Sequence, residues 1–143
     1  MDVMNEIRVK KRDVGATARL GRNSHPQLET PTGGSLSVVT AASEPGFNPL
    51  DLLFSSLAAC LVLSARIAAS RMGVLDRFAS VEAKVTGDKS EGEPARILRF
   101  HMTLKISGDF DEETKQAIAH QAEEICTVSN TLRGDAEFRL DVS

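Results

Sequence analysis

The sequence predicts an α+β protein, and three observations support this class. A long apolar segment over residues 48–72 carries the signals of one buried helix. Segments on both sides of it alternate apolar and polar side chains, as antiparallel strands do, and a second helical pattern covers residues 111–125. We therefore expect strands, a long helix, more strands, a second helix and a final strand, in that order.

The length and charge of the chain narrow its class further. With 143 residues it can bury an apolar core without disulfides or metal ions. We find no repeat, low-complexity tract or linker, so we expect a single domain over residues 1–143. The net charge of −3 disfavours a nucleic-acid partner, because phosphates attract a basic surface.

The N-terminus and the longest apolar segment indicate the cellular location that we expect for the protein. The N-terminus shows no basic stretch followed by an apolar run, so we expect no signal peptide. The longest apolar segment, residues 51–66, is short for a membrane span and fits a buried helix. We expect a cytoplasmic protein with no membrane partner, in which thiols stay reduced and free.

The N-terminal third reads as short strands separated by turns. We expect strands at residues 6–14 and 16–20, a third at 27–29, and a short extended piece at 37–39. Glycine and other turn-forming residues separate these segments.

The central helix has clear ends. Asn48 can cap it, Pro49 suits its first position, and Asp51 adds a favourable negative charge in the first turn. Arg71 lies in the last turn and Gly73 can close it. Because the helix is apolar nearly all round, we expect it to be central and buried.

The C-terminal half predicts strands at residues 81–85 and 98–106, then the second helix. A closing strand is expected over residues 136–142, where Phe138, Leu140 and Val142 alternate with charged side chains.

Two cysteines are the main candidates for chemistry. Cys60 lies within the apolar helix and Cys126 ends the second helix. A free cysteine in such a position is usually a small, inert core residue. Ser56 and Ser64, four residues on either side of Cys60 on the same helix face, indicate instead the wall of a pocket. Spacing alone neither pairs the two cysteines nor separates them.

Other site types are disfavoured. The cysteines lack the Cys-x-x-Cys spacing, and His25, His101 and His120 are scattered, so we expect no metal site. By themselves, Arg19 and Arg22 read as solvated charges of a hairpin.

Two motifs resemble the OsmC/Ohr family (osmotically inducible protein C and organic hydroperoxide resistance proteins). Residues 48–60, Asn-Pro-Leu-Asp-Leu-Leu-Phe-Ser-Ser-Leu-Ala-Ala-Cys, resemble the cysteine helix of that family. Residues 126–134, Cys-Thr-Val-Ser-Asn-Thr-Leu-Arg-Gly, resemble its second motif, Cys-Pro-Val-Ser/His-x-x-Leu. The order of elements agrees over almost the whole chain.

The resemblance implies an OsmC-like fold: an intertwined homodimer whose antiparallel sheets wrap around two long central helices, with active sites at the interface. It also implies a redox reaction. Cys60 would be the thiolate that attacks a peroxide, and Cys126 would then attack the Cys60 sulfenic acid to form a disulfide. An external dithiol, such as a dihydrolipoyl protein, would reduce that disulfide, and no cofactor or metal is needed.

The resemblance further implies a cation beside Cys60, because an ordinary thiol is mostly protonated at neutral pH and burial raises its pKa. In the peroxidase branch this cation is an arginine from the N-terminal strands, held by a glutamate. Arg19 and Arg22 are the candidates here, with Asp51 as the nearby carboxylate. At 100° per residue, however, Asp51 points away from the Cys60 face of the helix.

Two positions depart from the peroxidase pattern. Leu50 stands where the glutamate would be, and Thr127 replaces the usual proline after Cys126. These departures resemble a broader OsmC-like subgroup. We predict a thiol-dependent peroxidase that reduces organic hydroperoxides or hydrogen peroxide. The alternative is a non-catalytic OsmC-like dimer that binds a small apolar ligand or a partner and uses both cysteines for packing.

Overall fold

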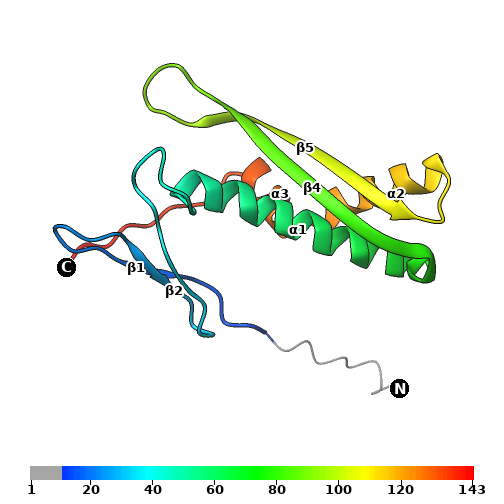
Figure 1. The fold of residues 1–143 in the computed structure, drawn as a ribbon, viewed down its shortest axis with the longest axis horizontal. Coiled ribbons are helices and arrows are strands. Elements are labelled where there is room, and N and C mark those ends of the chain that lie inside the picture. Colours follow the sequence, from blue (N-terminus) through cyan, green and yellow to red (C-terminus); the bar gives the residue numbers. More distant parts are fainter. Residues whose placement is uncertain (1–10) are drawn as a thin grey trace. The chain divides into compact units, whose positions relative to one another are not determined.

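The computed structural model describes residues 11–143 and has the predicted α+β composition (Figure 1). The chain divides into two compact units, with the boundary between Leu50 and Asp51. Each unit is described by itself below. The single domain expected over residues 1–143 stays a prediction.

The first unit contains a small antiparallel sheet with strand order β1-β2-β3. Its strands are β1 (Thr17–Arg19), β2 (Gln27–Glu29) and β3 (Ser35–Ser37). Gly33, with φ of 100°, lies in the turn between β2 and β3, where a side chain would be strained. The strands expected at 16–20 and 27–29 are thus confirmed within a residue or so.

Two N-terminal expectations need correction. The strand predicted at 6–14 lies partly outside the described residues, and residues 11–14 have no regular structure. Their alternation is weak, and an isolated extended segment gains nothing without a neighbouring strand. The extended piece predicted at 37–39 lies two residues earlier, as β3, and Val38 adds a single bridge to Phe47.

The second unit is built on the predicted long helix, α1 (Pro49–Arg71). A short 3-10 turn, η2 (Leu75–Arg77), leads into a long antiparallel hairpin of β4 (Phe78–Lys89) and β5 (Ile97–Gly108). The hairpin runs along α1 (Figure 1). The helices α2 (Glu112–Ile125) and α3 (Thr127–Arg133) follow.

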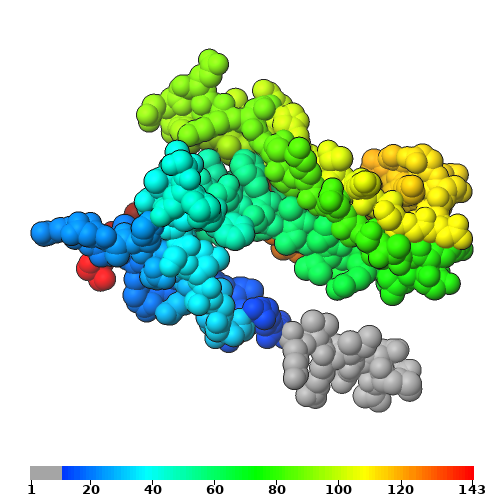
Figure 2. Space-filling model, in the orientation of Figure 1, coloured from blue at the N-terminus to red at the C-terminus, as the bar shows by residue number. Residues whose placement is uncertain are grey.

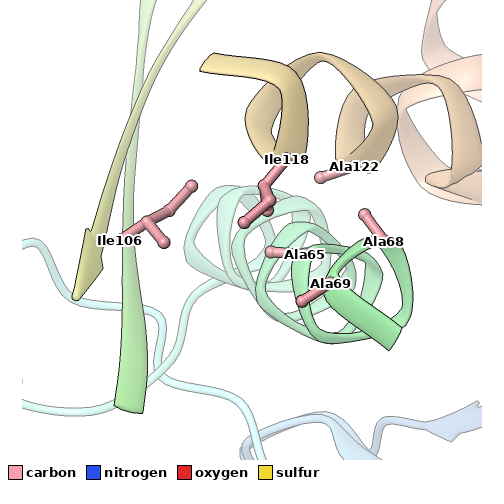
Figure 3. Packing of buried hydrophobic residues seen from close by; sticks show 6 residues of the cluster. All are labelled: Ala65, Ala68, Ala69, Ile106, Ile118 and Ala122. Atoms are coloured by element: carbon pink, nitrogen blue, oxygen red, sulfur yellow. The ribbon is translucent and has the colours of Figure 1, made fainter. Parts of the chain in front are cut away.

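One hydrophobic core joins α1, α2 and β5. Figure 3 views α1 along its axis, with α2 and β5 on neighbouring sides. Small side chains of α1 let α2 approach closely, and Ile118 fills the space between the helices and β5. The cluster consists of Ala65, Ala68, Ala69, Ile106, Ile118 and Ala122, all buried.

The helix α1 is less enclosed than its sequence predicts. By length and composition it could cross a membrane, yet both hydrophobic clusters of the second unit include its side chains, as in a core helix. One face stays open: Leu63 is 52% exposed and Ile67 42% exposed. Part of α1 is accordingly visible at the surface below β4 in Figure 2. The helix was predicted correctly, but its burial on all sides is wrong for the single chain.

The C-terminus differs most from prediction. Residues 136–142 form no strand, and the large side chains Phe138 and Leu140 are 94% and 89% exposed. An alternating segment becomes a strand only where an unpaired edge is available to it, and within the described residues of this chain it is not paired with one. The short helix α3, in contrast, was not predicted.

Candidate functional site

The two cysteines lie on different elements of the second unit. Cys60 is near the middle of α1. Cys126 occupies the junction of two helices, as the last cap of α2 and the first cap of α3. Its extended backbone (φ −64°, ψ 107°) turns the chain between them. The junction therefore holds the Cys126 side chain in a fixed direction.

The fold brings these two residues together. Cys126 is fully buried in a cluster with Leu57 and Leu61 of α1, and Cys60 packs against that cluster. A hydrogen bond links the two thiols. Both cysteines are free, and Cys60 is half-buried, so that reagents can approach it from solvent. Two sulfur atoms 66 residues apart in sequence are thus neighbours.

The surroundings of Cys60 favour its thiolate. Burial acts to raise its pKa, but hydrogen bonds outweigh burial and hold the pKa below its ordinary value. The donors are the backbone N–H of Val128, the Cys126 thiol, the Ser64 hydroxyl and the backbone N–H of Thr127. These are neutral groups, so the described contacts stabilise the anion by hydrogen bonding.

The surroundings of Cys126 favour its protonated form. Burial raises the pKa of this thiol, and the hydrogen bond with Cys60 raises it further. The backbone N–H of Ser129 donates to Cys126 Sγ at 3.3 Å and opposes this effect in part. The site therefore holds one sulfur ready to ionise and one sulfur that keeps its proton.

The residue after Cys126 contributes directly to this arrangement. Proline has no N–H, whereas Thr127 keeps one, and that N–H is among the donors to Cys60. The departure from proline noted in the sequence thus adds a hydrogen-bond donor at the first position of α3.

A pocket of about 280 Å³ borders the cluster that holds Cys126, and neither cysteine is among its lining residues. It shares Leu57 with the cluster around Cys126, and Ser129 and Arg133 of α3 line it. Arg133 Nε donates to Ser129 Oγ at 3.3 Å, and the same guanidinium pairs with Glu123. The other lining residues come from β5 and α3 and are mostly apolar: Ile97, Leu98, Arg99, Phe100, Met102 and Leu132.

The residues proposed to activate Cys60 are described here within the unit to which each belongs. Arg19 is on β1 in the first unit, where it pairs with Glu29 at 3.2 Å with both side chains largely exposed. Arg22 lies in the turn after β1. Asp51 is an exposed residue of the first turn of α1, nine residues before Cys60, which puts it half a revolution away.

Sequence reasoning missed the backbone donors, because α3 itself was not predicted. The sequence places Ser56 and Ser64 on the same helix face as Cys60, but the structure shows that they differ in burial. Ser64 is buried beside Cys60, and Ser56 is exposed. Among the described residues, no cluster of three or more His, Cys, Asp or Glu side chains could hold a metal ion.

Comparison with known proteins gives a consistent result. The sequence model of a family described as OsmC-like protein matches residues 41–141, a stretch that includes both cysteines. No curated protein matches the chain.

Several solved structures have the same fold. An organic hydroperoxide resistance protein OsmC from Legionella pneumophila aligns with a TM-score of 0.68 at 22% identity, over 89% of this chain and 93% of that one. An OsmC-like protein from Mycoplasma pneumoniae gives 0.72 at 21% identity, over 88% and 90%. The organic hydroperoxide resistance protein OhrB of Bacillus subtilis gives 0.64 at 25% identity, over 85% and 90%.

Proposed function

Because the chain belongs to the OsmC-like protein family, we propose that it is a thiol-dependent peroxidase that reduces organic hydroperoxides. The observation that carries the proposal is the hydrogen-bonded pair of Cys60 and Cys126, with the pKa of one thiol lowered and that of the other raised. The names of similar structures, which refer to organic hydroperoxide resistance, support the same substrate class.

In the first step the Cys60 thiolate attacks the terminal oxygen of the hydroperoxide. The O–O bond breaks, an S–O bond forms, and the leaving alkoxide takes up a proton to become an alcohol. Cys60 is thereby oxidised by two electrons to a sulfenic acid. The lowered pKa supplies the reactive thiolate, and the half-buried position of Cys60 leaves a path for the peroxide.

In the second step Cys126 attacks the Cys60 sulfenic acid. An S–S bond forms, and the hydroxyl leaves as water with the proton of Cys126. The two thiols are already in contact, so little movement is required. An external dithiol, such as a dihydrolipoyl protein, then reduces the disulfide by thiol–disulfide exchange. The chemistry uses no metal or organic cofactor.

The apolar surroundings of the pair favour organic peroxides over hydrogen peroxide. Val85, Phe100 and Met102 pack around the cluster that holds Cys126, and Phe100 and Met102 also line the pocket beside it. An alkyl or aryl group gains free energy when such surfaces remove it from water.

The proposal includes the expected assembly. We assign the enzyme to the cytoplasm and to a homodimer, without nucleic-acid or membrane partners. The open face of α1, with Leu63 and Ile67 exposed, and the unpaired C-terminal segment support a second copy as the missing neighbour. Arg19 or Arg22 supplies the cation near Cys60 in this assembly, with Asp51 as the nearby carboxylate.

Mass spectrometry tests the proposal. Reduced protein is mixed with about one equivalent of cumene hydroperoxide, the amount that oxidises one thiol pair. We expect the loss of two hydrogen atoms and a Cys60–Cys126 disulfide in the peptide map. Cys126→Ser should accumulate the sulfenic acid, which dimedone traps, and Cys60→Ser should stay unmodified.

The same experiment addresses the alternative, a dimer that binds a small apolar ligand and uses its cysteines for packing. The pocket of about 280 Å³, close to the lower limit for small-molecule sites, is where this alternative would place the ligand. Thiols that stay reduced during prolonged exposure to excess cumene hydroperoxide would reject the peroxidase proposal and leave the binding function.

A further inference from the structure

A buried serine lies one helical turn beyond Cys60. Ser64 follows Cys60 by four residues on α1, so the two side chains lie on the same face of the helix. Only 3% of Ser64 is exposed, and it is the one polar side chain among the buried residues of α1. Its neighbours in the helix, Leu61 and Ala65, are fully buried apolar residues.

A hydroxyl in such surroundings needs a hydrogen-bonding partner, because its removal from water is otherwise unfavourable. The Ser64 hydroxyl is one of the groups that lower the pKa of the Cys60 thiol by hydrogen bonding. A serine O–H can donate, and a sulfur anion is a better acceptor than a neutral thiol, so this contact is strongest after Cys60 has lost its proton.

Ser56 provides the internal comparison. It also lies four residues from Cys60, on the other side along α1. Ser56 is exposed, and its hydroxyl donates to the Leu53 carbonyl oxygen at 2.8 Å. The hydrogen bond of Ser56 is therefore satisfied within its own helical turn and does not involve the cysteine.

From the burial of Ser64, its position one turn from Cys60 and its hydroxyl contact with that sulfur, we infer that Ser64 is a dedicated donor to the Cys60 thiolate. Its role is to hold the anion in place on α1, opposite the backbone N–H groups of Thr127 and Val128 at the start of α3. The inference deepens the proposed peroxidase function, since it names a further residue that contacts the reacting sulfur.

The chemical character of the other groups around Cys60 is compatible with this role of Ser64. From the α2–α3 junction comes one titratable group, the Cys126 thiol. From β4 and β5 the cluster receives apolar side chains, among them Ala83, Val85 and Phe100. Because these neighbours are apolar, loss of the Ser64 hydroxyl should change the reactivity of the Cys60 sulfur measurably.

The test measures alkylation of Cys60 by iodoacetamide as a function of pH, with the two cysteine peptides resolved by mass spectrometry. In Ser64→Ala, which keeps a strong helix former at the position, the rate at pH 7 should fall about threefold to tenfold, as expected for the loss of one hydrogen bond of ordinary net strength. The midpoint of the pH profile should move upward. Ser64→Thr, which retains the hydroxyl, should keep the wild-type profile.

Ser56→Ala is the matched control and should leave rate and midpoint unchanged. An unchanged profile in Ser64→Ala, or an equal change in Ser56→Ala, overturns the inference. Circular dichroism and thermal unfolding verify that each variant is folded. Because alkylation uses no peroxide, a failure of the peroxidase proposal, seen as a wild-type protein inert to cumene hydroperoxide, is distinguishable from a failure of the Ser64 inference.

Discussion

The thiol of Cys126 is hydrogen-bonded to the sulfur of Cys60, across the contact between α1 and the start of α3. This contact shifts the two pKa values in opposite directions and so gives the two sulfurs different roles. The asymmetry arises from position: Cys126 is fully buried at a helix junction, and Cys60 is half-buried where backbone N–H groups reach it.

The two cysteines should therefore differ in their pH-dependent reactivity. The pKa of Cys60 is lowered, so its alkylation should already be rapid near neutral pH and reach its plateau below the range of an ordinary thiol. The pKa of Cys126 is raised, so its alkylation should begin only at higher pH. Peptide-resolved alkylation between pH 5 and about 10 checks this. Equal rates for both cysteines across that range would contradict the assigned roles.

Thr127→Pro should slow the reaction of Cys60. The substitution removes one backbone N–H donor to the sulfur, while proline is well tolerated at the first position of a helix. We expect about a threefold to tenfold lower alkylation rate at pH 7, the effect of losing one hydrogen bond of ordinary net strength. Thr127→Ala, which keeps the N–H, is the control and should behave like wild type. If both variants react equally slowly, the threonine side chain rather than its N–H is responsible.

One of the two N-terminal arginines should influence Cys60 in the assembled protein. If a guanidinium lies beside the thiolate, its removal should lower the peroxide reaction rate at pH 7 by about tenfold or more. Stopped-flow measurements with cumene hydroperoxide on Arg19→Ala and Arg22→Ala identify the residue. Glu29→Gln, which removes the observed partner of Arg19, is a useful companion. Wild-type rates in both arginine variants would show that neutral donors alone activate the sulfur.

The C-terminal segment should contribute to a dimer. Phe138, Leu140 and Val142 alternate with charged residues and are 87–94% exposed in the single chain. A partner that covers them would gain substantial hydrophobic free energy. Light scattering should give twice the mass of one chain, and Leu140→Asp should shift the equilibrium toward monomer. Asp141→Asn, on the other face of the segment, should not. A wild-type protein that is monomeric at micromolar concentration would count against the dimer.

The core between α1 and α2 should dominate the stability of the second unit. Ile118 is fully buried among alanines of α1 and Ile106 of β5 (Figure 3). Ile118→Ala should lower the free energy of unfolding by roughly 3 kcal/mol, through lost burial and a residual cavity. Gln116→Ala, at an exposed position of the same helix, should change it by less than about 0.5 kcal/mol. Urea unfolding followed by circular dichroism measures both. Similar losses in the two variants would contradict the assigned core.

The sequence by itself determined the elements whose signals are local. The limits of α1 follow from Pro49 and Gly73, and the presence of strands β4 and β5 follows from the alternation along residues 81–85 and 98–106. These features depend on neighbours within a few residues, which a sequence pattern records. Both cysteines could be singled out for the same reason, since each lies in a motif of contiguous residues.

The tertiary structure decided what those residues do together. Spacing along the chain could not predict that Cys60 and Cys126 touch, that Ser64 faces inward while Ser56 faces solvent, or that Thr127 offers its N–H to a sulfur on another helix. Such contacts join residues far apart in sequence, and their free energies depend on distance, direction and burial, which exist only after the chain has folded. The strand predicted at residues 136–142 is absent for a related reason. An alternating sequence gives a strand one apolar and one polar face, but the strand also needs the edge of another strand to pair with.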